Sequence, residues 1–293
     1  MTIAANDLFI GVDGGGTSCR ARLTDAQGQL LAEAKAGPAN VYQNAPGSLD
    51  SIMTAINQCL TQAGLSQDDH GRIHVGMGLA GAEITVAHNF LADWQHPFKT
   101  LVFQNDAHTA CLGAHQGENG AMLIVGTGIK GWLIRDDHIW SCTGWGFPLA
   151  DQGSGAWLGL RLLQETLDAC DGLRPHSEAT EEVLSKFAGD PSNISVWAAT
   201  AKSGDYGQFA PLVVYGQPKG DLVAKKIMQE QAAIVSRILD RMLAQQPGKI
   251  ALLGGLIPFV KDNLPAHYHQ WLVEAQGDAM DGALQMIRKA VGA

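Results

Sequence analysis

The stretch at residues 8–17, LFIGVDGGGT, constrains the fold more than any other part of the chain, because a short apolar run leads directly into three consecutive glycines. The apolar run predicts a buried strand, and the glycines predict a sharp turn that exposes backbone N–H groups. Glycine has no Cβ, so an anion such as phosphate can approach this backbone closely. Gly14, Gly15, Gly16 and the hydroxyl of Thr17 are therefore candidate phosphate ligands.

Asp13 precedes these glycines and places a carboxylate where phosphates are expected. The two would repel each other unless a divalent cation lay between them, so we expect Mg²⁺ at Asp13, held through water. Two common glycine-rich motifs do not fit: Gly11 and Gly16 have Walker A spacing, but Thr17 replaces the lysine, and Asp13 breaks the dinucleotide pattern. An ordinary tight turn is the alternative interpretation.

The pattern of a buried strand, a Gly/Thr loop and two further short strands occurs twice, about 110 residues apart. In the second occurrence, the apolar run AMLIV leads into Gly126, Thr127 and Gly128. Strands alternate with helices between the two occurrences, which predicts two similar halves of an α/β protein. The expected strands are 8–12, 17–24, 29–35, 73–79, 100–104, 121–125, 132–135 and 139–142, and the expected helices are 49–60, 84–94 and 107–115.

The remainder of the chain is expected to be mainly helical from residue 156 to about residue 246. It closes with a strand at 250–253, a Gly254-Gly255 turn and a final helix at about 281–289. Ser48 precedes the apolar face of the helix expected at 49–60, and serine is a favoured N-cap, so the pattern predicts that this helix begins there.

Composition limits the classes of function. With 293 residues, of which 46% are hydrophobic and 17% charged, the chain is long enough for two domains. Its net charge of −9 argues against nucleic acid or an anionic membrane as a partner. Neither a signal-like N-terminus nor a run of about 18 apolar residues occurs, so we expect a soluble cytoplasmic protein. The five cysteines form no CxxC motif, which predicts reduced, mostly buried thiols.

An ordered set of motifs runs through the whole chain. The duplicated βββαβα pattern resembles the two-lobed actin-like ATPase (ribonuclease H-like) fold of class α/β, in which an active-site cleft lies between the lobes. Within that superfamily, the motifs resemble the glucosamine and N-acetylglucosamine kinases, which are related to the BadF/BadG/BcrA/BcrD-type ATPases. The residues that carry the likeness are GVDGGGT (11–17), Asn40, LAGAE (79–83), NDAHTA (105–110), GTG (126–128), GWG (144–146), DQGS (151–154), DGLRPH (171–176) and SGDYGQFAP (203–211).

The resemblance implies an organisation in two lobes. Residues 1–116 would form an N-terminal lobe with the first phosphate loop, completed by the C-terminal helix at about 280–293. Residues 117–279 would form a C-terminal lobe with the second phosphate loop and the adenosine site. Because related kinases form dimers, a homodimer is expected. The cofactors implied are ATP and Mg²⁺, and the partner is a small-molecule amino sugar.

The reaction implied is transfer of phosphate from ATP to the 6-hydroxyl of D-glucosamine. Asp106 follows an apolar strand and begins a helix, so its carboxylate is expected where α/β sheets place ligands, and it is the candidate general base. Capping of that helix is the alternative role for this aspartate, and one residue can do both. The resemblance implies that the sugar is bound by Asn40, Gly81, Asp106, Gly144, Trp145, Gly146 and Asp151. It implies that the phosphates are bound by Gly14–Thr17, Gly126, Thr127 and Gly128. It places the adenosine beside Gly254 and Gly255.

Three alternatives to a glucosamine kinase remain open from the sequence. N-acetylglucosamine kinase differs only in whether the pocket meets an acetyl group or an ammonium at C2. An ATP-driven activator or regulator is suggested by the BadF-type relatives, although the iron–sulfur activators among them use closely placed cysteines that this chain lacks. A sugar-binding protein without catalysis is suggested by one departure from the family: Ile129, followed by Lys130, stands where members commonly carry serine.

Overall fold

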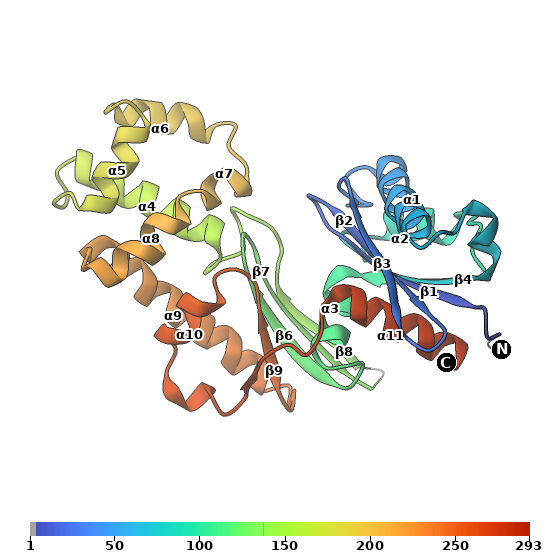
Figure 1. Cartoon of the computed structure of the whole chain (residues 1–293). Coiled ribbons are helices and arrows are strands. Elements are labelled where there is room, and N and C mark those ends of the chain that lie inside the picture. The colour runs from blue at the N-terminus through green and yellow to red at the C-terminus, as the bar shows by residue number, and fades with distance from the viewer. Residues whose placement is uncertain (1–3, 137) are drawn as a thin grey trace. The chain divides into compact units, whose positions relative to one another are not determined.

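The computed structural model describes residues 4–136 and 138–293. Its contacts divide the chain into two compact units. Unit 1 comprises Met1–Met122, Trp132–Ile139 and Glu274–Ala293, and unit 2 comprises Leu123–Gly131 and Trp140–Val273. Figure 1 shows the elements of both units along the chain. Among the described residues, no helix is long and apolar enough to cross a membrane.

Unit 1 is built on a sheet that, in the described part of the chain, has five strands in the order β3-β2-β1-β4-β5. The first three strands form the predicted antiparallel meander, whereas β4 and β5 run parallel to β1. A parallel neighbour requires a crossover connection, which the helices provide. The strands are β1 (Leu8–Gly14), β2 (Cys19–Asp25), β3 (Leu30–Ala36), β4 (Ile73–Leu79) and β5 (Thr100–Asn105).

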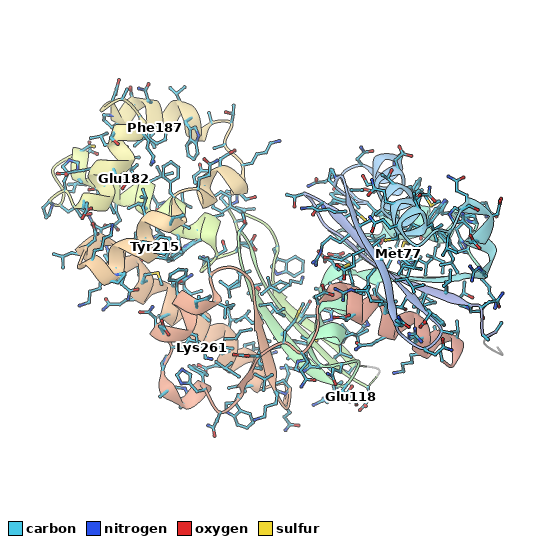
Figure 2. All side chains as sticks on the ribbon, in the orientation of Figure 1. Met77, Glu118, Glu182, Phe187, Tyr215 and Lys261 are labelled. Atoms are coloured by element: carbon cyan, nitrogen blue, oxygen red, sulfur yellow. The ribbon has the colours of Figure 1, made fainter. Side chains whose placement is uncertain are left out.

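Helices cover both faces of this sheet, so nearly all residues of its strands β1 and β4 are buried. Side chains of β1 alternate: Ile10 joins the core beneath α1, whereas Phe9 on the other face packs with Leu284 and Ile287 of α11. In β4 every residue is buried, and Met77 lies within the dense stick cluster of this unit in Figure 2. The helices are α1 (Ala45–Gln62), η1 (Gln67–Arg72), α2 (Thr85–Ala92), α3 (Asp106–Ala114) and α11 (Ala279–Val291).

The start of α1 differs from the expectation. The helix begins at Ala45, and its N-cap is Asn44, whose side-chain oxygen accepts a hydrogen bond from the Gly47 N–H at 3.1 Å. Pro46 lies in the first turn, where its missing N–H costs nothing. Ser48 is therefore a buried residue inside the helix, and its prediction as the N-cap was wrong.

A second five-stranded sheet, counted over the described residues, has the order β10-β9-β6-β7-β8. In reverse, this order is β8-β7-β6-β9-β10, which matches the order β3-β2-β1-β4-β5 of the first sheet. Strands β6, β7 and β8 therefore correspond to β1, β2 and β3. The duplicated core predicted from the sequence is therefore confirmed. The strands are β6 (Gly120–Val125), β7 (Ile129–Arg135), β8 (His138–Thr143), β9 (Ile250–Leu253) and β10 (Leu272–Val273).

Outside this sheet, unit 2 is largely helical, as predicted. It contains an aromatic group in which Phe187, labelled in Figure 2, stacks on Phe209 and meets Trp197 edge-on. The elements are α4 (Gly155–Cys170), α5 (Glu178–Lys186), α6 (Pro191–Ala198), α7 (Ser203–Gly207), α8 (Ala210–Gly216), η2 (Gln217–Lys219), α9 (Leu222–Leu243), α10 (Ile257–Asn263) and η3 (Ala266–Tyr268).

Glu165 of α4 is a charged residue in this helical region, with only 1% of its surface exposed. Three cations surround its carboxylate: Arg161 at 2.9 Å, Lys226 at 2.9 Å, and Arg174. Burial alone would raise the pKa of Glu165, but the hydrogen bond from Lys226 and the charges of the three cations outweigh it and lower the pKa below 4.5. The ionised carboxylate therefore stabilises the folded state.

Glu165→Gln is expected to lower the free energy of unfolding at pH 7 by about 1–3 kcal/mol, because a charged acceptor of three cations is lost. The pKa of Glu165 is lower in the folded state than the unfolded value of 4.5, so the ionised carboxylate contributes its full stability above pH 4.5. This contribution is lost as the pH falls through the folded pKa. The difference between the variant and the wild type should therefore shrink in urea titrations below pH 4.5. Glu182→Gln, at a half-exposed pair with Lys186, is the control and should change stability little.

Candidate active site

The predicted site residues of unit 1 emerge at one edge of its sheet. Gly14, Leu79 and Asn105 are aligned across β1, β4 and β5, at the carboxyl ends of these parallel strands. Neighbouring strands lie about 4.8 Å apart, so the segments that follow these three residues leave the sheet side by side. The end of β3 reaches the same edge, because Ala36 pairs with Cys19. This edge thus carries the first glycine loop, the loop containing Asn40, Gly81 and the start of α3.

The glycines of the first loop are required for different reasons. A Cβ on Gly14 would lie 2.5 Å from Leu79 and 3.0 Å from Ala39, so close packing excludes a side chain there. Around Gly16 no atom lies within 4 Å of a Cβ position, and both Gly16 and Thr17 are exposed. Within the described chain, no neighbouring atom requires a glycine at position 16. A ligand that approached the backbone closely would require one.

Asn40 and Gly81 are in contact. The side-chain oxygen of Asn40 accepts hydrogen bonds from the N–H groups of Tyr42 and Gln43, both at 3.1 Å, which fixes its orientation. Gly81 has a φ of +82°, and a Cβ there would lie 3.0 Å from that oxygen and 2.7 Å from Tyr42. Only glycine suits this position. The structure therefore brings together these two residues, which the sequence assigned to the sugar.

Asp106 is the first residue of α3, but it is not the cap of the helix. The N-cap is Asn105, whose side-chain oxygen accepts a hydrogen bond from the His108 N–H at 2.8 Å. The Asp106 carboxylate accepts a hydrogen bond through Oδ1 from the adjacent Ala107 N–H, at 2.8 Å. The positive end of the helix favours the ionised carboxylate. Capping thus falls to Asn105, and the alternative role considered for Asp106 is not needed.

Asp13 pairs with Arg20, which lies opposite it in the β1–β2 hairpin. The guanidinium donates to Asp13 Oδ2 from Nη2 at 2.6 Å and from Nε at 3.1 Å. No group of three or more metal-binding side chains occurs among the residues described. Magnesium commonly binds through one or two carboxylates, retained water and nucleotide phosphates, and a single carboxylate beside a phosphate loop fits that pattern. Asp13 could hold the ion in this way through Oδ1.

In unit 2, the second glycine loop, Gly126–Gly128, is closed by the first turn of α4. The N–H of Gly155 donates to Gly126 O at 2.7 Å, and the N–H of Ala156 donates to Thr127 O at 3.2 Å. The side chain of Thr127 is exposed, whereas Gly128 approaches Asp151, whose Oδ2 would lie 3.2 Å from a Cβ on the glycine. This loop is therefore held rigidly by its backbone.

The Gly254-Gly255 turn lies directly beside that loop. Gly254 has a φ of +106°, and a Cβ there would lie 2.3 Å from the carbonyl oxygen of Val125, the last residue of β6. The N–H of Leu256 donates to the same oxygen at 3.2 Å. Two segments that the sequence assigned to the nucleotide thus meet at one edge of the second sheet.

Asp151 and the Gly144–Gly146 loop lie together in the same unit. The backbone N–H groups of Gly146 and Ile129 donate to the Asp151 carboxylate, yet burial dominates and raises its pKa above the usual value. Its Oδ1 is buried and has no hydrogen-bond partner among the described residues. A buried carboxylate oxygen of this kind is costly unless a ligand satisfies it.

A cavity of about 460 Å³ adjoins these residues, lined in part by Trp145, Leu149, Asp151 and Arg241. The resemblance assigned Trp145 to the sugar. Its surface is 88% exposed, so it is not a core residue.

Ile129, the departure from the family pattern, points into the protein. Its side chain is buried, and its Cδ1 lies 3.7 Å from a Cβ position on Gly153. The neighbouring Lys130 lies against Gly144, where a Cβ would be 2.4 Å from the lysine Cδ. The positive charge of Lys130 opposes the rise in the pKa of Asp151 that burial causes. The missing hydroxyl is thus accompanied by a cation close to predicted sugar-binding residues.

Arg20 was not among the site residues expected from the sequence. The sequence does carry a signal for it. Arg20 alternates with buried residues of β2, and the glycine loop is short enough to return the chain beside β1. Without the register of the hairpin, however, the residue opposite Asp13 could not be assigned.

Comparison with known proteins gives consistent results. The profile of the BadF/BadG/BcrA/BcrD ATPase family matches residues 10–284. Glucosamine kinase GspK of Vibrio cholerae is 41% identical over 283 residues, which cover 97% of this chain and 96% of the relative. A Chromobacterium violaceum protein, provisionally described as an N-acetylglucosamine kinase, has a solved structure with a TM-score of 0.88 and 33% identity, covering 97% of this chain and 100% of its own.

A more distant structure shows the fold alone. The ROK family glucokinase of Streptomyces griseus, solved with glucose and AMPPNP, has a TM-score of 0.58 and 22% identity. The match covers 96% of this chain and 99% of the glucokinase. The likeness in fold agrees with the predicted α/β fold of two related halves.

Proposed function

The chain belongs to the BadF/BadG/BcrA/BcrD ATPase family, and we propose that it is a kinase that transfers the γ-phosphoryl group of ATP to the 6-hydroxyl of D-glucosamine. The observation that carries this proposal is 41% identity to a glucosamine kinase over nearly the full length of both chains. The grouping of Asn40, Gly81 and Asp106 at one sheet edge supports it, because sugar and base must be adjacent for proton transfer.

Asp106 acts as the general base in this proposal. Phosphoryl transfer requires positioning and charge neutralisation, and a carboxylate takes the hydroxyl proton late in the transfer. The N-terminus of α3 holds the Asp106 carboxylate through the Ala107 N–H, so the base is fixed in orientation before sugar binds. Asn40 and the Gly81 backbone bind sugar hydroxyls, and the backbone of Gly14–Gly16 with the hydroxyl of Thr17 contacts phosphate oxygens.

In unit 2, Gly126, Thr127 and Gly128 contact phosphate oxygens, and Gly254 with Gly255 lies beside adenosine. Asp151 and the Gly144–Gly146 loop contact the sugar. The buried, unsatisfied Oδ1 of Asp151 supports this assignment, because the ammonium or a hydroxyl of an amino sugar would donate the missing hydrogen bond.

In this proposal Asp13 would hold Mg²⁺ through water, and the ion would supply positive charge beside the phosphates of ATP. We further propose that the chain functions in the cytoplasm as a homodimer. The lobes predicted from the sequence, 1–116 with about 280–293 and 117–279, are proposed as its functional halves.

N-acetylglucosamine kinase is the second candidate, because the provisional description of the Chromobacterium violaceum relative favours it. The two activities are distinguished by kcat/KM for each sugar in a coupled ADP-release assay. We expect kcat/KM to be at least about tenfold higher for glucosamine, since Asp151 favours an ammonium at C2 and one charge-assisted hydrogen bond is worth roughly 1.5–3 kcal/mol. A preference for the N-acetyl sugar would contradict the proposal, and turnover of neither sugar would remove the kinase assignment.

A further inference from the structure

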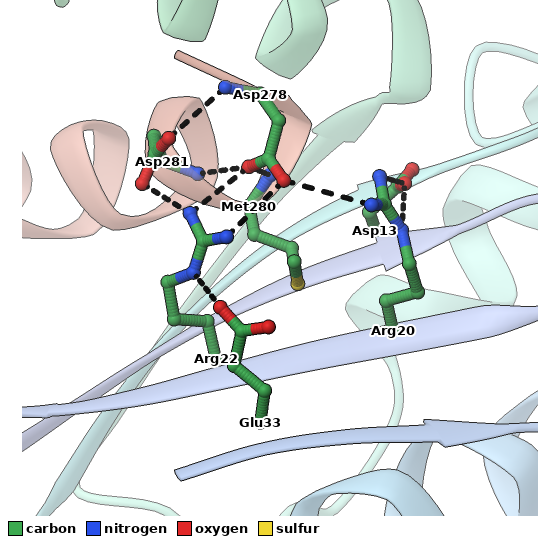
Figure 3. A network of polar contacts seen from close by, with 7 residues as sticks. All are labelled: Asp13, Arg20, Arg22, Glu33, Asp278, Met280 and Asp281. Carbon is green, nitrogen blue, oxygen red and sulfur yellow. Dashed lines mark hydrogen bonds and ion pairs between the residues drawn. The ribbon is translucent and has the colours of Figure 1, made fainter. Parts of the chain in front are cut away.

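Arg20 lies between two carboxylates of unit 1, as Figure 3 shows. On one side, its Nη2 and Nε donate to Asp13 Oδ2 at 2.6 and 3.1 Å. On the other side, its Nη1 lies 3.5 Å from Asp278 Oδ2. The arginine side chain is 41% exposed, so little packing opposes its movement between the two partners.

Asp278, by contrast, is fixed in place. It is the N-cap of α11, and its Oδ1 accepts hydrogen bonds from the Met280 and Asp281 N–H groups at 3.0 and 3.1 Å. Arg22 contacts both of its oxygens, at 3.1 and 3.2 Å, and is held in turn by Glu33 at 2.6 Å. Asp278 therefore presents a positioned carboxylate to Arg20 (Figure 3).

We propose that Arg20 is a positioning residue that neutralises Asp13 while no divalent cation is bound, and that it moves onto Asp278 when the cation binds. This inference rests on the proposed function, in which Asp13 binds the magnesium of the nucleotide. The Asp13–Arg20–Asp278 arrangement then determines how much the metal ion increases nucleotide affinity.

The charges require an arrangement of this kind. Without a metal ion, the negative Asp13 would repel a triphosphate at the glycine loop, and the Arg20 contact reduces that repulsion. When a divalent cation lies at Asp13, the guanidinium becomes a like charge only a few ångströms away. Arg20 Nη1 already lies 3.5 Å from Asp278 Oδ2, which is less than about 1 Å longer than an ordinary hydrogen bond. A small movement of Arg20 toward Asp278 therefore relieves the repulsion.

The test is the affinity of the wild type and variants for AMPPNP, measured by calorimetry with Mg²⁺ and with EDTA. The quantity compared is the ratio of Kd in EDTA to Kd in Mg²⁺, which requires no turnover. Arg20→Met should raise this ratio about three- to fivefold, the effect expected for a partly exposed charge pair, mainly because binding in EDTA weakens. Asp278→Asn should lower the ratio by a similar factor, because Arg20 loses its alternative partner. Asparagine is as good an N-cap as aspartate, so α11 is preserved.

Asp93→Asn is the control, because Asp93 is exposed and follows α2, away from the contacts of Asp13, Arg20 and Asp278, and the ratio should not change. If Arg20→Met weakens binding by the same factor in both conditions, Arg20 is a simple phosphate contact and the inference fails. A shift in the same direction for Arg20→Met and Asp278→Asn would also overturn it. A ratio of one for the wild type would overturn both the magnesium site of the proposed function and this inference. A wild-type ratio above one that does not change in Arg20→Met would overturn this inference alone.

Discussion

Asp106→Asn is expected to reduce kcat for glucosamine phosphorylation by about 10²–10⁴-fold, the usual contribution of a general base. The amide has the same shape and can still accept the Ala107 N–H through its oxygen, so the start of α3 should be preserved. Asn105 continues to cap the helix. Binding of glucosamine and of AMPPNP, measured by calorimetry, should therefore change little while turnover is lost.

The control removes a charge from the same unit without touching the proposed site. Asp93 is exposed and follows α2, so Asp93→Asn should leave kcat within about twofold of the wild type. Unchanged turnover in Asp106→Asn would remove this residue from the mechanism. Equal losses of sugar binding and turnover would make it a sugar ligand rather than the base.

Gly282→Ala is expected to cause a large loss of stability. Helices α3 and α11 cross so closely that a Cβ on Gly282 would lie 1.8 Å from the Thr109 carbonyl oxygen and 2.5 Å from the Gly113 nitrogen. These are backbone atoms, so a whole helix must move. Overpacking costs roughly 1–3 kcal/mol or more, and better helix propensity returns about 1 kcal/mol. Because the clash is with backbone atoms, we expect a cost at the upper end of that range, and therefore a net loss of about 2 kcal/mol in denaturant unfolding.

Gly113→Ala should behave in the same way, because its Cβ would lie 1.8 Å from the carbonyl oxygen of Asp278. Gly204→Ala in α7 is the matched control, since no atom lies within 4 Å of its Cβ position and its φ is not positive. That variant should be as stable as the wild type or slightly more stable. A Gly282→Ala protein as stable as the Gly204→Ala protein would contradict the close packing of α3 on α11.

Most of the fold could be predicted from local patterns. Apolar runs such as AMLIV in β6 identified buried strands, because strands covered on both faces have few polar positions. The repeat of strand and glycine loop predicted two similar halves, and the two sheets have matching strand orders. These features depend on residues close together in the sequence, for which hydrophobic periodicity is a strong guide.

Features that depend on distant residues were not predictable in the same way. The close contact of Gly113 and Gly282 joins helices more than 160 residues apart, and neither glycine carries a local signal of it. The start of α1 was placed too late because the first apolar residue of the helix, Leu49, lies a full turn after its cap. Apolar periodicity marks the buried face of a helix, not its first turn.

The candidate site was predictable in its residue types but not in its contacts. The family motifs named Asn40, Gly81 and Asp106, and the sheet register brings them to one edge. Their assignment as functional residues stays a prediction. The role of Asn105 as the helix cap and the contact of Arg20 with both Asp13 and Asp278 became visible only from side-chain positions.

The most direct test of the whole account is the product formed from ATP and glucosamine, followed by phosphorus NMR. The account predicts that each ATP consumed yields one ADP and one glucosamine 6-phosphate, and that the Asp106→Asn protein forms this product at least about a hundredfold more slowly. Release of inorganic phosphate without a phosphorylated sugar would contradict it, because ATP would then be hydrolysed by a protein that does not transfer phosphate to an amino sugar.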